Sequence, residues 1–211
     1  MATQPTSGGG MVDRIRNILL TPKPEWDRID AEPATEKGIM TGWVLPLAAI
    51  GPVAGLIGGQ VFGMGAFGIH WKLPIGVAIG GAVLGYILAV VNVWILAKVI
   101  DALAPSFGGT KNPVQAMKVA AYSMTASFVA GIFQIFPPLA FLSLLGLYGF
   151  YLLWLGEPKL MRAPEDKAVG YVVVTVVVAI VLYLVIGAIS GAVMAQFLTP
   201  ASMGITLPTA P

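Results

Sequence analysis

Four long stretches without a charged side chain dominate the hydrophobic pattern of this chain. They cover residues 39–69, 73–97, 119–156 and 168–211. A helix that crosses the hydrocarbon core of a bilayer, about 30 Å thick, needs about 20 consecutive apolar residues. The third stretch holds 38 residues and would form a helix about 57 Å long at about 1.5 Å per residue, which is too long for one crossing. Pro137 and Pro138 interrupt it near its middle and predict two spans joined by a tight turn.

We therefore predict an all-α fold, a polytopic integral membrane protein whose membrane domain (residues 39–197) is a five-helix transmembrane bundle. The predicted spans are about 40–63, 74–98, 113–136, 138–155 and 168–196. The last span contains a valine-rich run that would favour a β-strand in water. In a bilayer a lone strand cannot satisfy its backbone hydrogen-bonding groups, so we expect a helix there as well.

The segment before the first span is amphipathic rather than uniformly apolar. Between Met11 and Leu20 the apolar side chains recur at helical spacing, with charged side chains on the other face. Residues 11–38 are predicted to form a cytoplasmic amphipathic segment in the membrane interface, with a second short helix that has Pro24 in its first turn. The glycine-rich residues 1–10 are predicted to be disordered, and residues 198–211 to form a flexible external tail.

The basic residues predict which end of the bundle faces the cytoplasm. Eleven of the 12 Lys and Arg side chains fall in the N-terminal segment and around the second and fourth connections, and only Lys72 lies elsewhere. Because basic connections stay on the cytoplasmic side, we predict a bacterial cytoplasmic (inner) membrane protein with a cytoplasmic N-terminus and an external C-terminus. Lys118 lies one turn inside the third span, where we expect its amine to reach the lipid headgroups.

The composition excludes several classes of function. A net charge of +2, with only 10% charged residues, provides no basic face for nucleic acid. The chain has no cysteine and a single histidine, His70, so we expect no disulfide, no thiolate or histidine metal cluster and no cofactor. No Ser/His/Asp, Cys/His or paired-carboxylate arrangement suggests catalysis, and we therefore expect a protein that is not an enzyme.

Glycines recur every four residues in three of the predicted spans. These candidates for helix packing are Gly51, Gly55, Gly59 and Gly63 in the first span, Gly76 with Gly80 and Gly81 with Gly85 in the second, and Gly187 with Gly191 in the fifth. Small residues at this spacing allow two helix backbones to approach closely. We favour packing within one chain, and association of two copies is the alternative.

Two loop motifs have plain structural explanations. Gly63, Gly65 and Gly68 match the dinucleotide-binding pattern G-x-G-x-x-G, but no strand precedes them, so we expect an external turn. In the connection 101–111, the glycine amides beside Lys111 could hold a lipid phosphate. We favour an ordinary loop there as well.

The most polar side chains within the spans are amides. They are Asn92 and Gln134, with Gln60 close to one span end, and the third span adds Tyr122 and Ser123. A buried amide usually bonds a neighbouring helix, and a polar path for a solute is the alternative. Because Asn92 is nearer the cytoplasmic end of its span and Gln134 nearer the external end of its own, we do not expect them to meet. The predicted spans contain no Asp or Glu away from their ends, and proton relays generally use such groups.

A resemblance to a known family extends from about Ile15 to Ala188. It is carried by residues 18–26 (ILLTPKPEW) with Ile29 and Glu32, by Tyr122-Ser123 within 120–131, by residues 136–139 (FPPL), and by residues 148–155 (YGFYLLWL) followed by 158–161 (PKLM). In this order and spacing, these stretches resemble the Yip (Ypt-interacting protein) domain family in its bacterial form. The resemblance implies a five-helix membrane bundle with a cytoplasmic N-terminus and no established catalytic residues.

The resemblance also shapes the functional hypothesis. Eukaryotic members of the family bind prenylated Rab-type GTPases, associate with one another and act in vesicle traffic and membrane shaping. They carry an acidic-Leu-Tyr-Gly-Pro element before the first span, which this sequence lacks, so GTPase binding is not implied for this chain. We hypothesise a non-enzymatic membrane scaffold that organises the lipid bilayer or partners, either copies of itself or other membrane proteins. The alternative is a small permease or transporter subunit with a polar path near Asn92 and Gln134.

Overall fold

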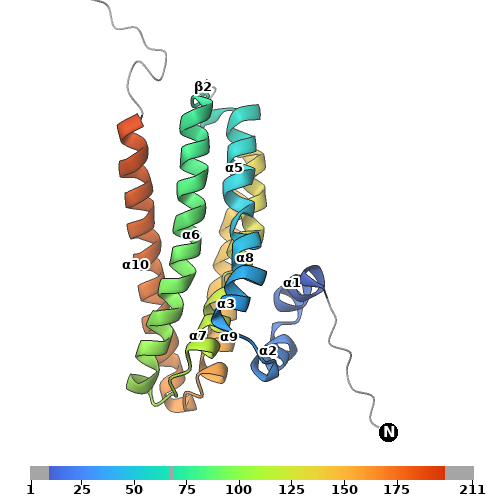
Figure 1. Ribbon diagram of the computed structural model, residues 1–211, viewed down its shortest axis with the longest axis vertical. Helices are drawn as coiled ribbons and strands as arrows, with labels where there is room; N and C mark the ends of the chain where they lie inside the picture. The colour runs from blue at the N-terminus through green and yellow to red at the C-terminus, as the bar shows by residue number, and fades with distance from the viewer. Residues whose placement is uncertain (1–9, 67–68, 198–211) are drawn as a thin grey trace, which may run out of the picture.

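The computed structural model describes residues 10–66 and 69–197 of the chain. Within these ranges the regular secondary structure is helical apart from one short antiparallel hairpin, in which β1 (Met64–Ala66) pairs with β2 (Ile69–Trp71). The long helices run side by side in one bundle (Figure 1). The segment predicted to be disordered, residues 1–10, and the predicted tail, residues 198–211, lie outside the described residues except for Gly10.

Five helical segments of the described chain are long and apolar enough to cross a membrane. The first consists of α3 (Glu36–Ile39), the π-helix η1 (Met40–Val44), α4 (Leu45–Ala48) and α5 (Ile50–Val61), and the second of α6 (Ile75–Leu103) and the 3-10 helix η2 (Ala104–Phe107). The third consists of α7 (Pro113–Ser123), α8 (Thr125–Ala130) and the 3-10 helix η3 (Gly131–Ile135). The fourth consists of the 3-10 helix η4 (Pro137–Leu147) and α9 (Tyr148–Leu160), and the fifth is α10 (Glu165–Phe197). The predicted all-α bundle with five spans is thus confirmed.

Local sequence signals explain where the third span begins and ends. The side chain of Asn112 caps α7, because its Oδ1 accepts a hydrogen bond from the backbone N–H of Gln115 at 3.1 Å. Pro113 occupies the first helical position, where its missing N–H costs nothing. At the other end Phe136 is extended, with φ −123° and ψ 102°, because a residue before proline avoids the helical region. The prolines therefore separate the third and fourth spans as expected.

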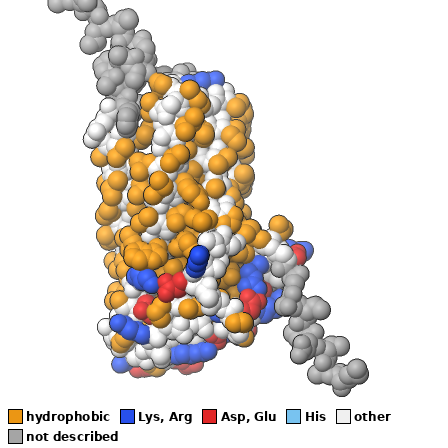
Figure 2. Space-filling model, viewed as in Figure 1, with side chains coloured by type: hydrophobic (Ala, Val, Ile, Leu, Met, Phe, Trp, Pro, Cys, Tyr) orange, Lys and Arg blue, Asp and Glu red, His pale blue; other side chains and the backbone are white. Residues whose placement is uncertain are grey.

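Charge is concentrated at one end of the bundle. Figure 2 shows Lys, Arg, Asp and Glu side chains gathered mostly at the end where α1 (Met11–Leu20) and α2 (Pro22–Ala31) lie, while hydrophobic side chains cover most of the remaining visible face. Large apolar side chains such as Val83 and Val181 are more than half exposed, which suits contact with hydrocarbon rather than water. The protein therefore contacts lipid along the sides of the bundle.

Helices α1 and α2 pack against the charged end of the bundle rather than standing free (Figure 1). Ile18 of α1 and Trp26 and Ile29 of α2 are buried in the same core as the spans. The apolar face of α1, which we expected in the membrane interface, is thus partly used for packing on the protein. Val12 and Leu20 remain exposed on the same helix.

The third span lies at the centre of the bundle and α10 at its periphery. In the third span 72% of the most apolar stretch is buried inside the protein, against 11% in α10. Helix α2 begins at Pro22, directly after Thr21, which ends α1, so Pro24 lies in its first turn as predicted. The short α2 packs against α9 and lies close to the central span.

Candidate functional site at the junction of the N-terminal helices and the bundle

The indole of Trp26 packs directly on Gly156 of α9. Trp26 is only 1% exposed, and a Cβ atom built on Gly156 would lie 2.5 Å from the indole Cζ2. The Trp26 ring also meets Tyr122 of α7 edge to face, with ring centroids 6.4 Å apart, a favourable aromatic geometry. Because residue 156 has no side chain, the Trp26 indole can pack directly on α9, and this contact holds α2 against α9.

The amine of Lys118 caps the C-terminal end of α2. Lys118 belongs to α7 and is 3% exposed. Its Nζ donates to the carbonyl oxygens of Ile29 and Glu32 at 2.6 Å each, and to that of Asp30 at 3.4 Å. The last carbonyls of a helix lack partners within it and carry the negative end of its dipole, so a cation is favourable there. Our expectation that Lys118 reaches the lipid headgroups is wrong, because α2 offers it three acceptors inside the protein.

Polar contacts between α2 and the neighbouring segments fix how α2 is oriented. Asp30 accepts from Nη2 of Arg162 at 2.8 Å and from Nε2 of Gln115 at 3.0 Å. Lys159 of α9 pairs with Asp27. Partly exposed ion pairs contribute at most about 1 kcal/mol each, so these contacts set geometry more than stability.

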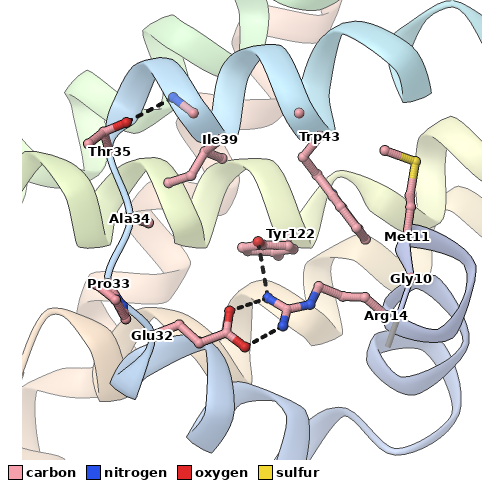
Figure 3. Close-up of a pocket in the computed structure, with 12 residues that line it drawn as sticks. Gly10, Met11, Arg14, Glu32, Pro33, Ala34, Thr35, Ile39, Trp43 and Tyr122 are labelled. Carbon is pink, nitrogen blue, oxygen red and sulfur yellow. Dashed lines mark hydrogen bonds and ion pairs between the residues drawn. The ribbon is translucent and has the colours of Figure 1, made fainter. Parts of the chain in front are cut away.

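Arg14 joins α1 to the end of α2 and to the third span (Figure 3). Its Nη1 donates to Oε2 of Glu32 at 2.6 Å and its Nη2 to Oε1 of the same carboxylate. Nη1 also donates to the hydroxyl of Tyr122 at 3.3 Å, and Nε lies 3.5 Å from Oε1 of the buried Glu25. A bidentate arginine–carboxylate pair is among the strongest ion pairs in proteins, so three segments meet at one side chain.

This ion pair shifts the pKa of both partners. The hydrogen bond with Glu32 raises the pKa of Arg14 above its ordinary range, although burial acts in the opposite direction. The hydrogen bond with Arg14 lowers the pKa of Glu32 below its ordinary value of 4.5, again against the effect of burial. Both groups are therefore held in their charged forms.

The lowered pKa of Glu32 predicts an acid-sensitive junction. The ionised carboxylate stabilises docking above pH 4.5, and this contribution is lost progressively as the pH falls from 4.5 through the depressed pKa of the folded state. Because the Glu32 side chain is 44% exposed, solvent screens the pair and the effect should be at most about 1 kcal/mol. Melting temperatures in detergent from pH 7 to pH 3 should fall less for Glu32→Gln than for the native chain. The exposed Asp13→Asn variant should follow the native curve, and an equal acid loss in Glu32→Gln would contradict this assignment.

A cavity of about 700 Å³ opens beside Arg14. Figure 3 shows Arg14 and Glu32 meeting next to the Tyr122 ring, with Met11 and Trp43 nearby. Arg14 donates hydrogen bonds to Glu32 and Tyr122, so the cavity offers an amphipathic surface with a paired charge. The described residues that line it include no serine, cysteine or histidine, and the arrangement is suited to holding segments together.

Glu157 is a buried polar residue of α9, near the end of the fourth span. Its side chain is 0% exposed, and its Oε1 accepts a hydrogen bond from Oγ1 of Thr175 on α10 at 2.5 Å. Its Oε2 has no partner among the described residues. The local sequence contains no sign of this burial, because the elements packed around this end of α9 come from distant parts of the chain.

The glycines of the first span face the third span of the same chain. A Cβ atom on Gly51 would lie 3.5 Å from Nε2 of Gln134, and one on Gly55 would lie 3.2 Å from its Oε1. The closest approach is at Gly58, outside the four-residue repeat, where a Cβ atom would lie 2.4 Å from the backbone oxygen of Gln134. Gly59 lines an internal cavity.

The other repeated glycines differ in their surroundings. Gly81 faces Met194 of α10, whose Sδ lies 3.1 Å from the position of a Cβ atom, and Gly85 faces Cγ of Pro52 at 4.0 Å. No described atom lies within 4 Å of the Cβ position at Gly76, Gly80, Gly187 or Gly191. The four-residue spacing thus coincides with close contact at some positions and open space at others.

The G-x-G-x-x-G segment forms a turn and part of the hairpin. Gly63 follows the end of the first span with φ of 80°, a left-handed conformation that glycine adopts readily. Gly65 pairs with His70 in the hairpin. Gly68 lies outside the described residues.

The loop amides near Lys111 are engaged within the protein. The N–H of Gly109 donates to the carbonyl of Ala104, and that of Thr110 to the carbonyl of Met161, each at 2.8 Å. These two donors are therefore not free to bind a phosphate.

Asn92 and Gln134 line one cavity of about 660 Å³ inside the bundle. No hydrogen bond joins the two side chains among the described residues, so our expectation that they do not meet is not contradicted. Gln60, at the same cavity, donates to the carbonyl of Leu73 at 3.1 Å. Ser123 is buried elsewhere in the third span, and its Oγ has no partner among the described residues.

The family comparison agrees with this architecture. The model of the Yip1 domain matches residues 16–189, from within α1 to within α10, a range that begins two residues after Arg14 and includes the rest of the anchoring contacts and most of the bundle. No curated protein and no solved structure matches the chain. With most of its length matched, the chain belongs to the Yip1 domain family.

Proposed function

We propose that this protein is a non-enzymatic membrane scaffold that organises partner proteins or the bilayer. One observation carries the proposal: Trp26, Lys118 and Arg14 anchor the N-terminal helices, so that α1 is held in a fixed position. On this anchored helix Val12 is 77% exposed and Leu20 70% exposed. Apolar side chains on an amphipathic helix beside the charged end of a bundle suit contact with lipid or with another protein.

We infer that the charged end faces the cytoplasm of a bacterial inner membrane. Eleven of the 12 basic residues support this orientation. The chain has no native cysteine, so single cysteines report accessibility cleanly. An impermeant thiol reagent applied to intact cells should label Lys72→Cys and leave Thr110→Cys unlabelled, and the reverse pattern would refute the orientation.

The scaffold proposal predicts that the exposed residues of α1 are needed for association. The double variant Val12→Gln, Leu20→Gln should lose proteins or lipids that co-purify with the native chain in mild detergent. The matched control Val12→Ile, Leu20→Met keeps apolar side chains and should retain them. Quantitative mass spectrometry of the three preparations measures the difference. Identical co-purifying sets would remove α1 from the association surface.

A small permease or transporter subunit is the second candidate. It is favoured by one observation, that Asn92 and Gln134 line the same cavity. Purified protein in liposomes distinguishes the two roles, since a scaffold should not accelerate the decay of a pH gradient reported by an entrapped dye. Proton-driven flux that Asn92→Leu abolishes would favour the permease.

A further inference from the structure

The cavity that contains Asn92 is a lengthwise slot along α6. Its lining on this helix runs from Ala78 to Asn92, a length of about 21 Å at about 1.5 Å per residue. Between these ends α6 contributes only glycine and alanine, at Gly81, Ala82, Gly85 and Ala89. The volume of about 660 Å³ falls within the range of small-molecule sites, about 300–1,000 Å³.

The first and third spans form most of the remaining lining of the slot, and the peripheral helix α10 forms one further wall. It contributes Tyr183, Ile186, Ser190 and Met194. Tyr183 is 73% exposed overall, so this wall borders both the slot and the surrounding bilayer. The slot is longer than half the hydrocarbon core, about 15 Å, and one extended lipid chain can lie along it.

The slot has a polar group at its end nearer the charged face. Oδ1 of Asn92 is buried and has no partner among the described residues, and an unpaired amide in hydrocarbon is costly. Lys98, six positions along α6, pairs with Glu36 at 2.8 Å, which puts Asn92 about 9 Å deeper than this ion pair along the helix. Oδ1 itself has almost no exposed surface, so an occupant that brings a hydrogen-bonding group to this depth would remove the cost once the Asn92 side chain rotates toward the slot.

The side chains that line the slot favour an occupant whose polar group is neutral. The described residues that line the slot include no lysine or arginine, so a phosphate there would lack a counter-charge. A hydroxyl both donates and accepts, and it can therefore pair with the Asn92 amide in either orientation of the amide.

We propose that the slot binds a neutral long-chain lipid whose hydroxyl group hydrogen-bonds Asn92 and whose chain lies along α6 toward Ala78. The site is separate from the junction at α1 and α2, and it does not depend on the scaffold role.

Three photoreactive probes with the same diazirine-bearing chain test this proposal, one ending in a hydroxyl, one in a methyl ether and one in a phosphate. The purified full chain in nanodiscs is labelled with each, and the adducts are mapped by peptide mass spectrometry. The alcohol should label the slot residues of α6 and α10 more than the lipid-facing residues of the same helices, while the ether and the phosphate should show no such preference. Asn92→Leu should abolish the preference for the alcohol.

Filling the slot gives a second, steric test. The nearest atom to a Cβ on Gly85 is Cγ of Pro52 at 4.0 Å, so Gly85→Leu places its side chain in open space. Labelling of the slot should fall to the level of lipid-facing residues in this variant and persist in Gly187→Leu, which lies outside the slot. Ala82→Leu replaces Gly85→Leu if size exclusion shows misfolding. Equal slot labelling by all three probes, or alcohol labelling that survives both Asn92→Leu and the filled slot, would overturn the proposal.

Discussion

Replacing Gly156 with leucine is expected to release the N-terminal helices from the bundle. Cζ2, Cε2 and Cη2 of Trp26 lie 2.5, 2.7 and 2.7 Å from the position of a Cβ atom at residue 156, so the indole must leave its seat. Loss of a buried large aromatic contact costs about 3–5 kcal/mol. Once Trp26 moves, α2 also loses the position in which Lys118 reaches its last carbonyls. Trypsin should then cleave rapidly after Arg28, which lies in α2, whereas the docked helix protects the native chain.

A matched substitution and a double variant make this test specific. Gly187→Leu introduces the same side chain into a span where no described atom lies within 4 Å of the Cβ position, and it should leave Arg28 protected. Adding Trp26→Ala to Gly156→Leu should cost little beyond Gly156→Leu alone, because residues in contact are non-additive. Slow cleavage in Gly156→Leu, equal to that of Gly187→Leu, would show that Trp26 does not anchor α2.

The second large effect is expected at Gly58, where the first and third spans touch backbone to backbone. A Cβ atom there would lie 2.4 Å from the carbonyl oxygen of Gln134 and 2.7 Å from that of Ile135. Backbone atoms cannot rotate aside as a side chain can, so Gly58→Leu should force the spans apart at a cost near the upper end of the range for overpacking, about 1–3 kcal/mol. A large fall in the melting temperature in detergent would report this loss.

A graded series controls for the general effect of adding leucine. Gly55→Leu should lower the melting temperature less than Gly58→Leu, because its nearest neighbour is the side-chain oxygen of Gln134 at 3.2 Å, which can move. Gly76→Leu has open space around it and should change little. Equal melting temperatures for Gly58→Leu and Gly76→Leu would argue against close packing at Gly58, and a shift in oligomer size at Gly55→Leu would instead place the stripe between two copies.

The number of spans could be derived from the sequence alone because it depends on local composition. A stretch long enough to cross hydrocarbon without a charge is visible wherever it occurs, and Pro137 divides the longest one by its effect on its own neighbours. Asn112 and Pro113 likewise determine the start of α7 within one helical turn. The segregation of charge to one end follows from the same pattern.

Only the tertiary structure decided what each polar or small residue in the spans contacts. Lys118 and Ile29 are 89 positions apart, and nothing in either segment specifies that α2 ends beside α7, so headgroup contact was the wrong expectation for that amine. Gly58 breaks the four-residue repeat and still makes the closest backbone contact, while Glu157 is buried at a span edge. The physical reason is that hydrophobicity places a helix in the bilayer but does not choose its neighbours. Shape and hydrogen bonds between distant segments make that choice.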